Sequence, residues 1–325
     1  MIVIRIIISL CISAICIFFA TKNVQWAELK TIISQIQYLP LVLGFLISTL
    51  TFWLRAFRWQ ILLSPFQKIP NFQLLKWQVG GLLINNLLPF RIGEFVRAYW
   101  TGHKTSIPKS SVFATIVMER LLDILSLAVI AFFLILYLGF NRFNITIPKE
   151  LMIAIGIIFL FLFIFTIFFL PNMNIKTWVN PLLKILPQKI SEMILRFAEG
   201  LSIFKNKKEI LKVILLSPLI WIVDIGIIAI LSRCVQLNLS WIEAGLLSVG
   251  LILGVMIPAA PGAAGTYEAG GVTALGLIGI SKTLALSFVL ILHSYQFLII
   301  LALGIPVLIS EGFSLKQFIQ KKPLE

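Results

Sequence analysis

Segments that are long and apolar enough to cross a membrane recur along the chain and constrain its fold more than any other feature. A spanning helix needs about 20 mostly apolar residues. That length is reached near residues 2–20, 38–62, 111–139, 151–170, 211–232 and 283–309. Of the 325 residues, 59% are hydrophobic and only 12% are charged, a balance foreign to soluble domains. We therefore expect an all-α polytopic membrane protein, with residues 1–325 forming one integral membrane domain.

Two further apolar regions are interrupted at their centres. Residues 74–100 are broken at Pro89, and residues 241–280 are broken around Pro258 and Pro261. Each half is too short to span a bilayer comfortably, which is typical of re-entrant hairpins or discontinuous helices. The alternative is a pair of short spanning helices joined by a Pro/Gly turn. The prediction is six spanning helices plus two broken, re-entrant helical hairpins.

The order of these segments repeats. Two spans, a broken pair and a further span occur over about 1–139 and again over about 151–309. The first copy starts inside and the second starts outside, so the pattern predicts an inverted-topology repeat. In many secondary transporters built this way, the substrate site lies near the midplane between the two repeats.

The net charge of +14 does not indicate nucleic-acid binding, because the basic residues fall in short loops between apolar segments. With a cytoplasmic N-terminus, most of them collect on the cytoplasmic side, where we count Arg55, Arg58 and Arg97. This bias follows the positive-inside rule. It predicts a multi-pass protein of the plasma (inner) membrane with both termini cytoplasmic, and it favours an uncleaved first helix over a signal peptide.

Residues 188–204 have the helical spacing of an amphipathic helix, with Ile190 and Met193 on its apolar face. We expect this helix to lie on the cytoplasmic membrane surface. Lys205, Lys207 and Lys208 follow it and would favour anionic lipid. The alternative is a plain basic loop that only sets topology.

The residue types of a soluble catalytic centre are missing from the sequence. Three cysteines have no metal-ligand spacing, and no catalytic triad or nucleotide-binding loop is legible. We therefore expect no catalytic residues, no metal site, no cofactor and no enzymatic activity.

Charged residues at membrane depth are costly and mark functional sites by default. In the first break, Arg91 stands where the second half-helix begins, so its planar donor fork and the helix N-terminus both suit a phosphate. Glu94 follows in the first turn. The alternatives are that Glu94 neutralises Arg91 or caps the helix.

The second break contains Gly262 and Gly265, which allow close approach of the backbone, and Glu268 lies on the first turns of the following half-helix. If the hairpins enter from opposite sides, their tips meet near the midplane. Two positive helix ends would then face one cavity. Alternatively, the glycines only permit tight helix packing.

Further charges occur inside the spans. Glu119 and Asp123 are four residues apart and share a helix face, whereas Arg120 is rotated by about 100° from Glu119. They could reach Arg91 or the cavity, or form a structural ion pair. Asp224 is isolated in an apolar span, and we expect its partner to be Arg91 or Arg120. His293 lies at a similar depth. It either acts as a proton relay or only forms a hydrogen bond to a neighbouring helix.

Three motifs together resemble the flippase-like transmembrane region of bacterial lysylphosphatidylglycerol synthases. They are Asn86-x-x-Pro89-x-Arg91-x-Gly93-Glu94-x-x-Arg97, Glu119-Arg120-x-x-Asp123, and Pro258-x-x-Pro261-Gly262-x-x-Gly265-x-x-Glu268. The resemblance covers nearly the whole chain and implies movement of lipids between leaflets, without the cytoplasmic aminoacyl-transferase domain. One departure is Ala263, where a second glycine would be expected.

The leading hypothesis is a lipid translocase that moves an anionic, phosphate-bearing lipid or a polyprenyl-phosphate-linked lipid. The expected partners are anionic membrane lipids and no nucleic acid, and a homo-oligomer is a further option. The alternatives are a secondary transporter of a small soluble anion, and a membrane enzyme or accessory subunit acting on lipid carriers. Glu28, the sole acidic residue of the first outer loop, argues against the enzyme. The candidate substrate-binding residues are Asn86, Arg91, Glu94, Arg97, Glu119, Arg120, Asp123, Asp224, Gly262, Gly265 and Glu268.

Overall fold

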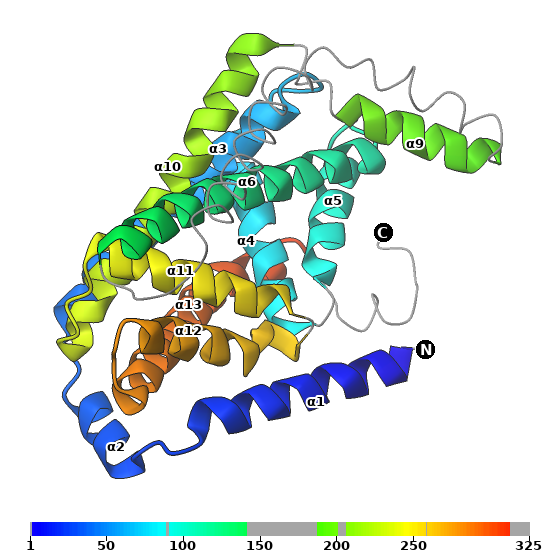
Figure 1. Cartoon of the computed structure of the whole chain (residues 1–325). Helices are drawn as coiled ribbons and strands as arrows, with labels where there is room; N and C mark the ends of the chain where they lie inside the picture. Colours follow the sequence, from blue (N-terminus) through cyan, green and yellow to red (C-terminus); the bar gives the residue numbers. More distant parts are fainter. Residues whose placement is uncertain (1, 89–90, 142–186, 201–205, 258, 313–325) are drawn as a thin grey trace.

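The computed structural model describes residues 2–88, 91–141, 187–200, 206–257 and 259–312, and within them the regular elements are helices without strands. Figure 1 shows their arrangement as a helical bundle with α1 along one edge. The elements are α1 (Ile2–Thr21), α2 (Trp26–Ser34), α3 (Tyr38–Leu63), α4 (Asn71–Leu87), α5 (Ile92–Lys104), α6 (Lys109–Asn141), α9 (Gln188–Gly200), α10 (Lys207–Ser232), η3 (Arg233–Val235), α11 (Trp241–Met256), η4 (Pro261–Ala263), α12 (Thr266–Leu277) and α13 (Lys282–Ser310).

Three helices in the described part of the chain are long and apolar enough to span a membrane: α3, α10 and α13. They confirm the spans expected over 38–62, 211–232 and 283–309. A fourth candidate is the pair α1 and α2, which is bent by 87°. The expected segment 111–139 is helical as α6, and the segment 151–170 lies outside the described residues. Six spans therefore stay a prediction.

Local sequence signals explain where several of these helices begin. Ser240 and Glu243 form a reciprocal capping box at the start of α11. The Ser281 hydroxyl accepts a hydrogen bond from the Leu284 N–H at the start of α13, and the Asn206 side chain accepts one from Glu209 N–H before α10. Each cap satisfies an N–H that the first turn of a helix leaves unpaired.

Both predicted breaks are present, and each separates two helices that pack on one another. Gly81 and Gly93 bring α4 and α5 into backbone contact, because a Cβ added to Gly93 would overlap the Gly81 carbonyl oxygen. Gly250 and Gly270 do the same for α11 and α12. Both breaks therefore fold the chain back into a hairpin. Pro89 and Pro258 themselves lie outside the described residues.

The long helices α3 and α10 are antiparallel and define two ends of the bundle. At one end, the Gln37 N–H donates to the Cys234 carbonyl over 3.0 Å. At the other end, Leu62 of α3 and Ile210 of α10 belong to one buried cluster. Each hairpin can be assigned to one of these ends.

The first hairpin opens at the Leu62 end. Glu311, just beyond α13, accepts a hydrogen bond from Gln73 at the start of α4 (3.4 Å) and pairs with Lys104 at the end of α5 (3.6 Å). The second hairpin opens at the Gln37 end, since α11 follows directly after α10 and α12 leads into the start of α13. The two hairpins thus enter the bundle from opposite ends.

The tips of the hairpins meet inside the bundle. A Cβ added to Gly262 in η4 would lie 3.7 Å from the Asn86 carbonyl oxygen near the end of α4. Helix α1 adjoins the same place, because the Ala260 N–H donates to the Ser13 hydroxyl over 2.8 Å, and α1 runs beside α12 (Figure 1). The sequence motifs of the two breaks are therefore neighbours in space.

Helix packing is matched between the two halves. In the first half α4 packs on α13 and α5 packs on α6. In the second half the corresponding helices behave alike, since α11 packs on α6 and α12 packs on α13. The long helices α3 and α10 also pack on each other. A two-fold repeat would produce this pairing. The inverted-topology repeat, and the side of a membrane that each half faces, stay predictions.

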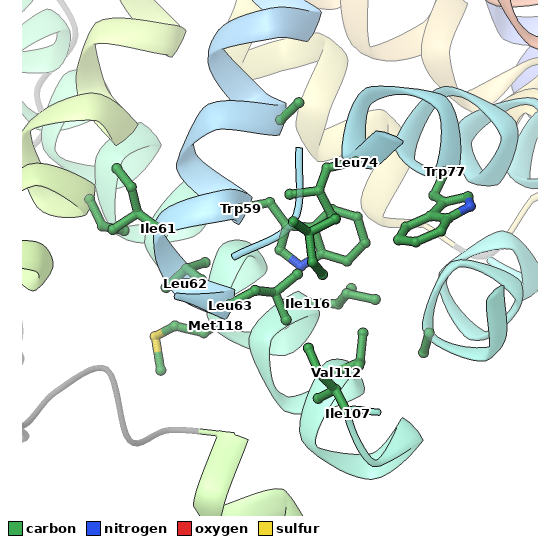
Figure 2. Close-up of a cluster of buried hydrophobic side chains, with 14 of the residues drawn as sticks. Trp59, Ile61, Leu62, Leu63, Leu74, Trp77, Ile107, Val112, Ile116 and Met118 are labelled. Carbon is green, nitrogen blue, oxygen red and sulfur yellow. The ribbon is translucent and has the colours of Figure 1, made fainter. Parts of the chain in front are cut away.

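A buried cluster at the Leu62 end ties α3, α4 and α6 together (Figure 2). Trp59 and Trp77 are among its largest buried side chains. The Trp59 indole N–H donates to the Thr115 hydroxyl of α6 over 3.0 Å, which satisfies a donor whose burial would otherwise cost stability. The cluster holds the first hairpin firmly against α3 and α6.

The amphipathic segment at 188–204 is helical over Gln188–Gly200, and the remainder with Lys205 lies outside the described residues. The Ser111 hydroxyl of α6 donates to the Arg196 carbonyl over 2.7 Å. Ile190 and Met193 stay exposed. The helix is therefore docked on α6 with part of its apolar face uncovered, and its place on a membrane surface remains a prediction.

Candidate functional site

Arginines and carboxylates from four helices form one connected ion-pair network between α3, α5, α6 and α10. Four arginines face four carboxylates, so the network carries no formal net charge. Its members are Arg55, Arg58, Glu94, Arg97, Glu119, Arg120, Asp123 and Asp224.

The inner part of the network is fully enclosed. Arg58 donates from Nη1 to Asp123 Oδ1 over 2.7 Å and to the Ser217 hydroxyl over 3.0 Å, and its Nη2 lies 3.9 Å from Glu119 Oε1. Arg97 Nη2 lies 2.7 Å from Glu119 Oε2, and its guanidinium stacks 3.4 Å from the centre of the Trp59 ring. Buried charges of this kind are tolerated because each has partners, and removal of one partner is costly.

The outer part of the network is partly exposed. Arg120 donates from Nε to Glu94 Oε1 over 2.9 Å and lies 3.6 Å from Asp123. Arg55 pairs with Asp224. The Arg120 side chain is 36% exposed and that of Asp224 is 25% exposed. Partly exposed charges at membrane depth need a polar or water-filled space around them. We infer that this side of the network faces such a space.

The network adds two arginines to the candidate residues and corrects one expectation. Arg55 and Arg58, which the charge count assigned to the cytoplasmic side, lie within α3, and Arg97 is buried within α5; the side of a membrane that they face stays a prediction. Asp224 does not pair with Arg91 or Arg120; Arg55 is its partner because α3 and α10 pack side by side. The spacing of Arg55 and Arg58, three apart on one helix face, is the signal that could have identified them.

Arg91 stands apart from the network. It is exposed, adopts a left-handed conformation with φ of 53° as the N-cap of α5, and forms no ion pair with any described residue. The pairing of Glu94 with Arg91 is therefore wrong, since Glu94 is bonded to Arg120. Next to it, the Gly93 N–H donates to the Asn85 side-chain oxygen over 2.7 Å. Arg91 is therefore a cation without an ion-pair partner among the described residues, and it lies at a positive helix end.

The surroundings of Arg91 combine apolar and polar groups. Leu87 before it and Phe95 after it are both exposed. Asn86 is half-buried and adjoins Gly262 of the second break. Candidate residues from both breaks are thus brought together, whereas Glu119 and Arg97 are enclosed in the network behind them.

The second break is held by Glu268 and His293. One Glu268 oxygen, Oε2, accepts from the Gly265 N–H at the start of α12 over 2.7 Å, and Oε1 lies 2.6 Å from His293 Nδ1. His293 Nε2 lies 3.0 Å from the Gly262 carbonyl oxygen. The positive end of α12 is therefore occupied by its own carboxylate, and at the start of α5 the Gly93 N–H is bonded to the Asn85 side chain, so the exposed cation at the α5 end is the guanidinium of Arg91.

The arrangement fits anion binding better than metal binding. Within the described ranges, no group of three or more His, Cys, Asp or Glu side chains is placed to hold a metal ion. Carboxylates of the network are already engaged by arginines. The one exposed charge without a partner in the described part of the site is the guanidinium of Arg91, which suits a phosphate.

Comparison with known proteins identifies relatives among membrane proteins. Residues 6–304 match the family model described as the lysylphosphatidylglycerol synthase TM region. The protein named UPF0104 membrane protein MJ1595 from Methanocaldococcus jannaschii is 31% identical over 202 residues, covering 57% of this chain and 58% of the relative. UPF0104 membrane protein MJ1078 of the same organism is 28% identical over 191 residues, covering 58% of this chain and 76% of the relative. No solved structure matches significantly.

Proposed function

This chain belongs to the family of lysylphosphatidylglycerol synthase transmembrane regions, and on that premise we propose that it is a lipid translocase. Its substrate is a lipid whose anionic headgroup carries a phosphate, either a phospholipid or a polyprenyl-phosphate-linked lipid. The headgroup passes the point where the two hairpin tips meet, while its chains stay among the membrane lipids. Family membership supports a membrane role that concerns lipids, and the residues at the breaks support the substrate class.

The observation that carries this proposal is Arg91 at the N-terminus of α5, which is exposed and has no ion-pair partner in the described part of the chain. The arginines of the network are neutralised by carboxylates, whereas Arg91 has no described ion-pair partner. A guanidinium presents several N–H donors in a fork that matches phosphate oxygens. The helix end adds a partial positive charge. Together they form an anion-binding position in the first break.

Two exposed apolar side chains favour a lipid over a soluble anion. Leu87 and Phe95 lie on either side of Arg91 along the chain and are 45% and 58% exposed. A site for a small soluble ligand is a concave pocket that buries most of the ligand, whereas these two side chains are open to the surroundings. An arginine between lipid-facing side chains instead suits a headgroup whose chains remain in the bilayer.

The partly exposed part of the network provides a second polar contact for the headgroup. Arg120 and Glu94 lie on α6 and α5, and Glu94 is one helical turn from Arg91. Their paired charges give hydrogen-bonding groups without a net charge, so Arg91 decides the sign of the ligand. The balanced network then lets the headgroup move on after binding, because it adds no strong attraction of its own.

Reconstituted vesicles test the proposal. The purified protein is placed in liposomes that contain a fluorescent phosphatidylglycerol analogue, and the fraction of label reachable by a membrane-impermeant quencher is followed over time. Loss of a charge-assisted hydrogen bond costs about 1.5–3 kcal/mol. Arg91→Ala is therefore expected to slow lipid movement by at least about tenfold, and Arg91→Lys to have an intermediate effect because it keeps the charge without the fork.

Arg233→Ala serves as the matched control, since Arg233 is an exposed arginine in the short helix η3 that follows α10 and is not a member of the network. Lipid movement by Arg91→Ala at the wild-type rate would refute the role of Arg91. Parallel assays with a labelled polyprenyl phosphate and with radioactive inorganic phosphate separate the substrate classes. Uptake of inorganic phosphate without lipid movement would favour the transporter of a soluble anion.

A further inference from the structure

Both ring nitrogens of His293 face hydrogen-bond acceptors. Nδ1 lies 2.6 Å from the Glu268 carboxylate, and Nε2 lies 3.0 Å from the carbonyl oxygen of Gly262. A carbonyl oxygen only accepts, so Nε2 must carry a proton for this contact to form. The short contact at Nδ1 then needs a second proton, which belongs either to the ring or to the carboxyl group. The Glu268–His293 pair in this conformation therefore holds two protons.

Removal of one of these protons breaks a contact. The pair with two protons is an imidazolium beside a carboxylate, or a neutral imidazole beside a carboxylic acid. With one proton fewer, a neutral imidazole with a single N–H faces two acceptors and satisfies only one of them. Either the Glu268 contact or the Gly262 contact is then lost. The proton that leaves is taken up by water, since the His293 and Glu268 side chains are 21% and 11% exposed.

The contacts of His293 with Glu268 and Gly262 hold the second break in place. Glu268 also caps α12 by accepting from the Gly265 N–H, and Gly265 and Gly262 both have positive φ values, of 89° and 68°. The Gly262 residue adjoins Asn86 at the tip of the first hairpin. Loss of either histidine contact therefore loosens the backbone where the two hairpin tips meet.

Other titratable groups leave this pair to act on its own. Tyr267 stacks on the His293 ring with centroids 4.3 Å apart, and its hydroxyl donates to Gln296. Helix α1 presents Ser13 and Ile17 to Gly265, while Glu28 and Lys30 of α2 are exposed. On the adjoining elements, several titratable groups are engaged elsewhere: Tyr295 with Ser48, Asp224 with Arg55, Lys282 with the Phe19 carbonyl, Glu209 with Lys212, Lys76 with the Phe72 ring, and Glu243 with Ser240. The remaining groups near the pair include the free thiols of Cys11 and Cys16 on α1 and the guanidinium of Arg91 at the tip of the first hairpin.

We propose that Glu268 and His293 form a proton-binding site that couples the movement of one proton to the opening of the second break. The inference rests on the proposed function, because it assigns the energy source for lipid movement past the hairpin tips. Binding of the proton closes the break through both histidine contacts. Its release to the other side of the membrane leaves one acceptor unpaired and opens the break.

A pH gradient across the vesicle membrane tests this coupling. Lipid movement is measured in liposomes with and without a gradient of one pH unit, in the wild type and in His293→Gln. One pH unit corresponds to a tenfold ratio of proton concentrations, so a one-proton coupling predicts up to a tenfold effect of the gradient in the wild type. In His293→Gln the ratio is expected to fall to one, since glutamine does not titrate in this range.

The control is Thr273→Ala, because Thr273 is an exposed residue of α12 whose hydroxyl bonds only to the carbonyl of Ala269 one turn away. Its response to the gradient is expected to equal that of the wild type. Thermal unfolding in detergent shows whether His293→Gln is still folded. If that variant is unfolded, Glu268→Gln and His293→Asn are measured in the same way.

A second measurement does not depend on transport. Histidine labelled with ¹⁵N at the ring is read by NMR between pH 5 and 9, and Glu268→Gln identifies the signal of the pair. At low pH, we expect either both ring nitrogens of His293 to be protonated, or one ring nitrogen together with the Glu268 carboxyl group. As the pH rises, the pair is expected to lose one proton. No titration over this range would overturn the proton site.

The two hypotheses fail in different ways. Lipid movement that is insensitive to the gradient in the wild type would refute the coupling and leave the translocase standing. The absence of lipid movement in the wild type under every gradient would refute the translocase. The NMR titration would then decide the proton site by itself.

Discussion

Ala263 has a backbone conformation that glycine adopts without a steric cost. Its φ is 58°, in the left-handed region, and it lies in the second break between Gly262 and Ala264. A Cβ in this region costs about 1 kcal/mol or more. The alanine in place of the expected glycine therefore places strain in the second break.

Ala263→Gly is accordingly expected to stabilise the fold by about 1 kcal/mol, since it removes the strain of a Cβ at positive φ. Thermal unfolding of the purified protein in detergent measures the effect. The control is Ala27→Gly on the exposed face of α2, where glycine is expected to destabilise by about 1 kcal/mol. A drop in the melting temperature for both variants would show that the strain at Ala263 is absent.

At the scale of the elements, glycines decide how closely the two halves of each hairpin approach. Gly93 of α5 lies directly on the Gly81 carbonyl of α4. This contact needs two residues without side chains at the crossing point, as in many helix pairs within membranes. It leaves the N-terminus of α5, with Arg91, held at the tip of the hairpin.

Gly93→Ala is expected to destabilise the protein by at least about 2 kcal/mol, because its Cβ overlaps backbone that has no room to shift within the hairpin. The matched control is Gly276→Ala in α12, where an added Cβ meets nothing within 4 Å and alanine favours the helix by up to about 1 kcal/mol. Unfolding temperatures in detergent compare the two. If Gly93→Ala and the wild type have the same unfolding temperature, this would contradict the close packing of α4 on α5.

Element types and positions followed well from the sequence, because they depend on local properties. Apolar length predicted α3, α10 and α13, and helix-breaking residues predicted both breaks. The ion pairs of Arg55 and Arg58 were not predicted. The charge count placed both residues on the cytoplasmic side, whereas carboxylates on α6 and α10 neutralise them within the bundle.

At the scale of the whole molecule, the two hairpins enter from opposite ends of the bundle, so cysteine labelling can test the topology. In a variant without Cys11, Cys16 and Cys234, Lys68→Cys and Lys104→Cys mark the end where the first hairpin opens. Arg233→Cys marks the other end. The positive-inside rule predicts that the first two react with a membrane-impermeant maleimide only in inverted vesicles, and that Arg233→Cys reacts only in right-side-out vesicles.

All three positions are exposed in the structure, so a lack of labelling reports sidedness and not burial. Maleimide added after the membrane is opened with detergent provides the control for reactivity. Labelling of Arg233→Cys and Lys104→Cys from the same side would rule out the opposed hairpins across a membrane.

The sequence by itself determined that the chain is helical, that it belongs in a membrane, and where its two breaks lie. These properties depend on the cost of placing polar groups and unpaired backbone in lipid, which each segment meets on its own. Only the tertiary structure decided which charges pair. Asp224 pairs with Arg55, Glu94 pairs with Arg120, and Arg91 has no described ion-pair partner. The sequence could not show these pairs, because helix packing brings together residues that are up to 169 positions apart.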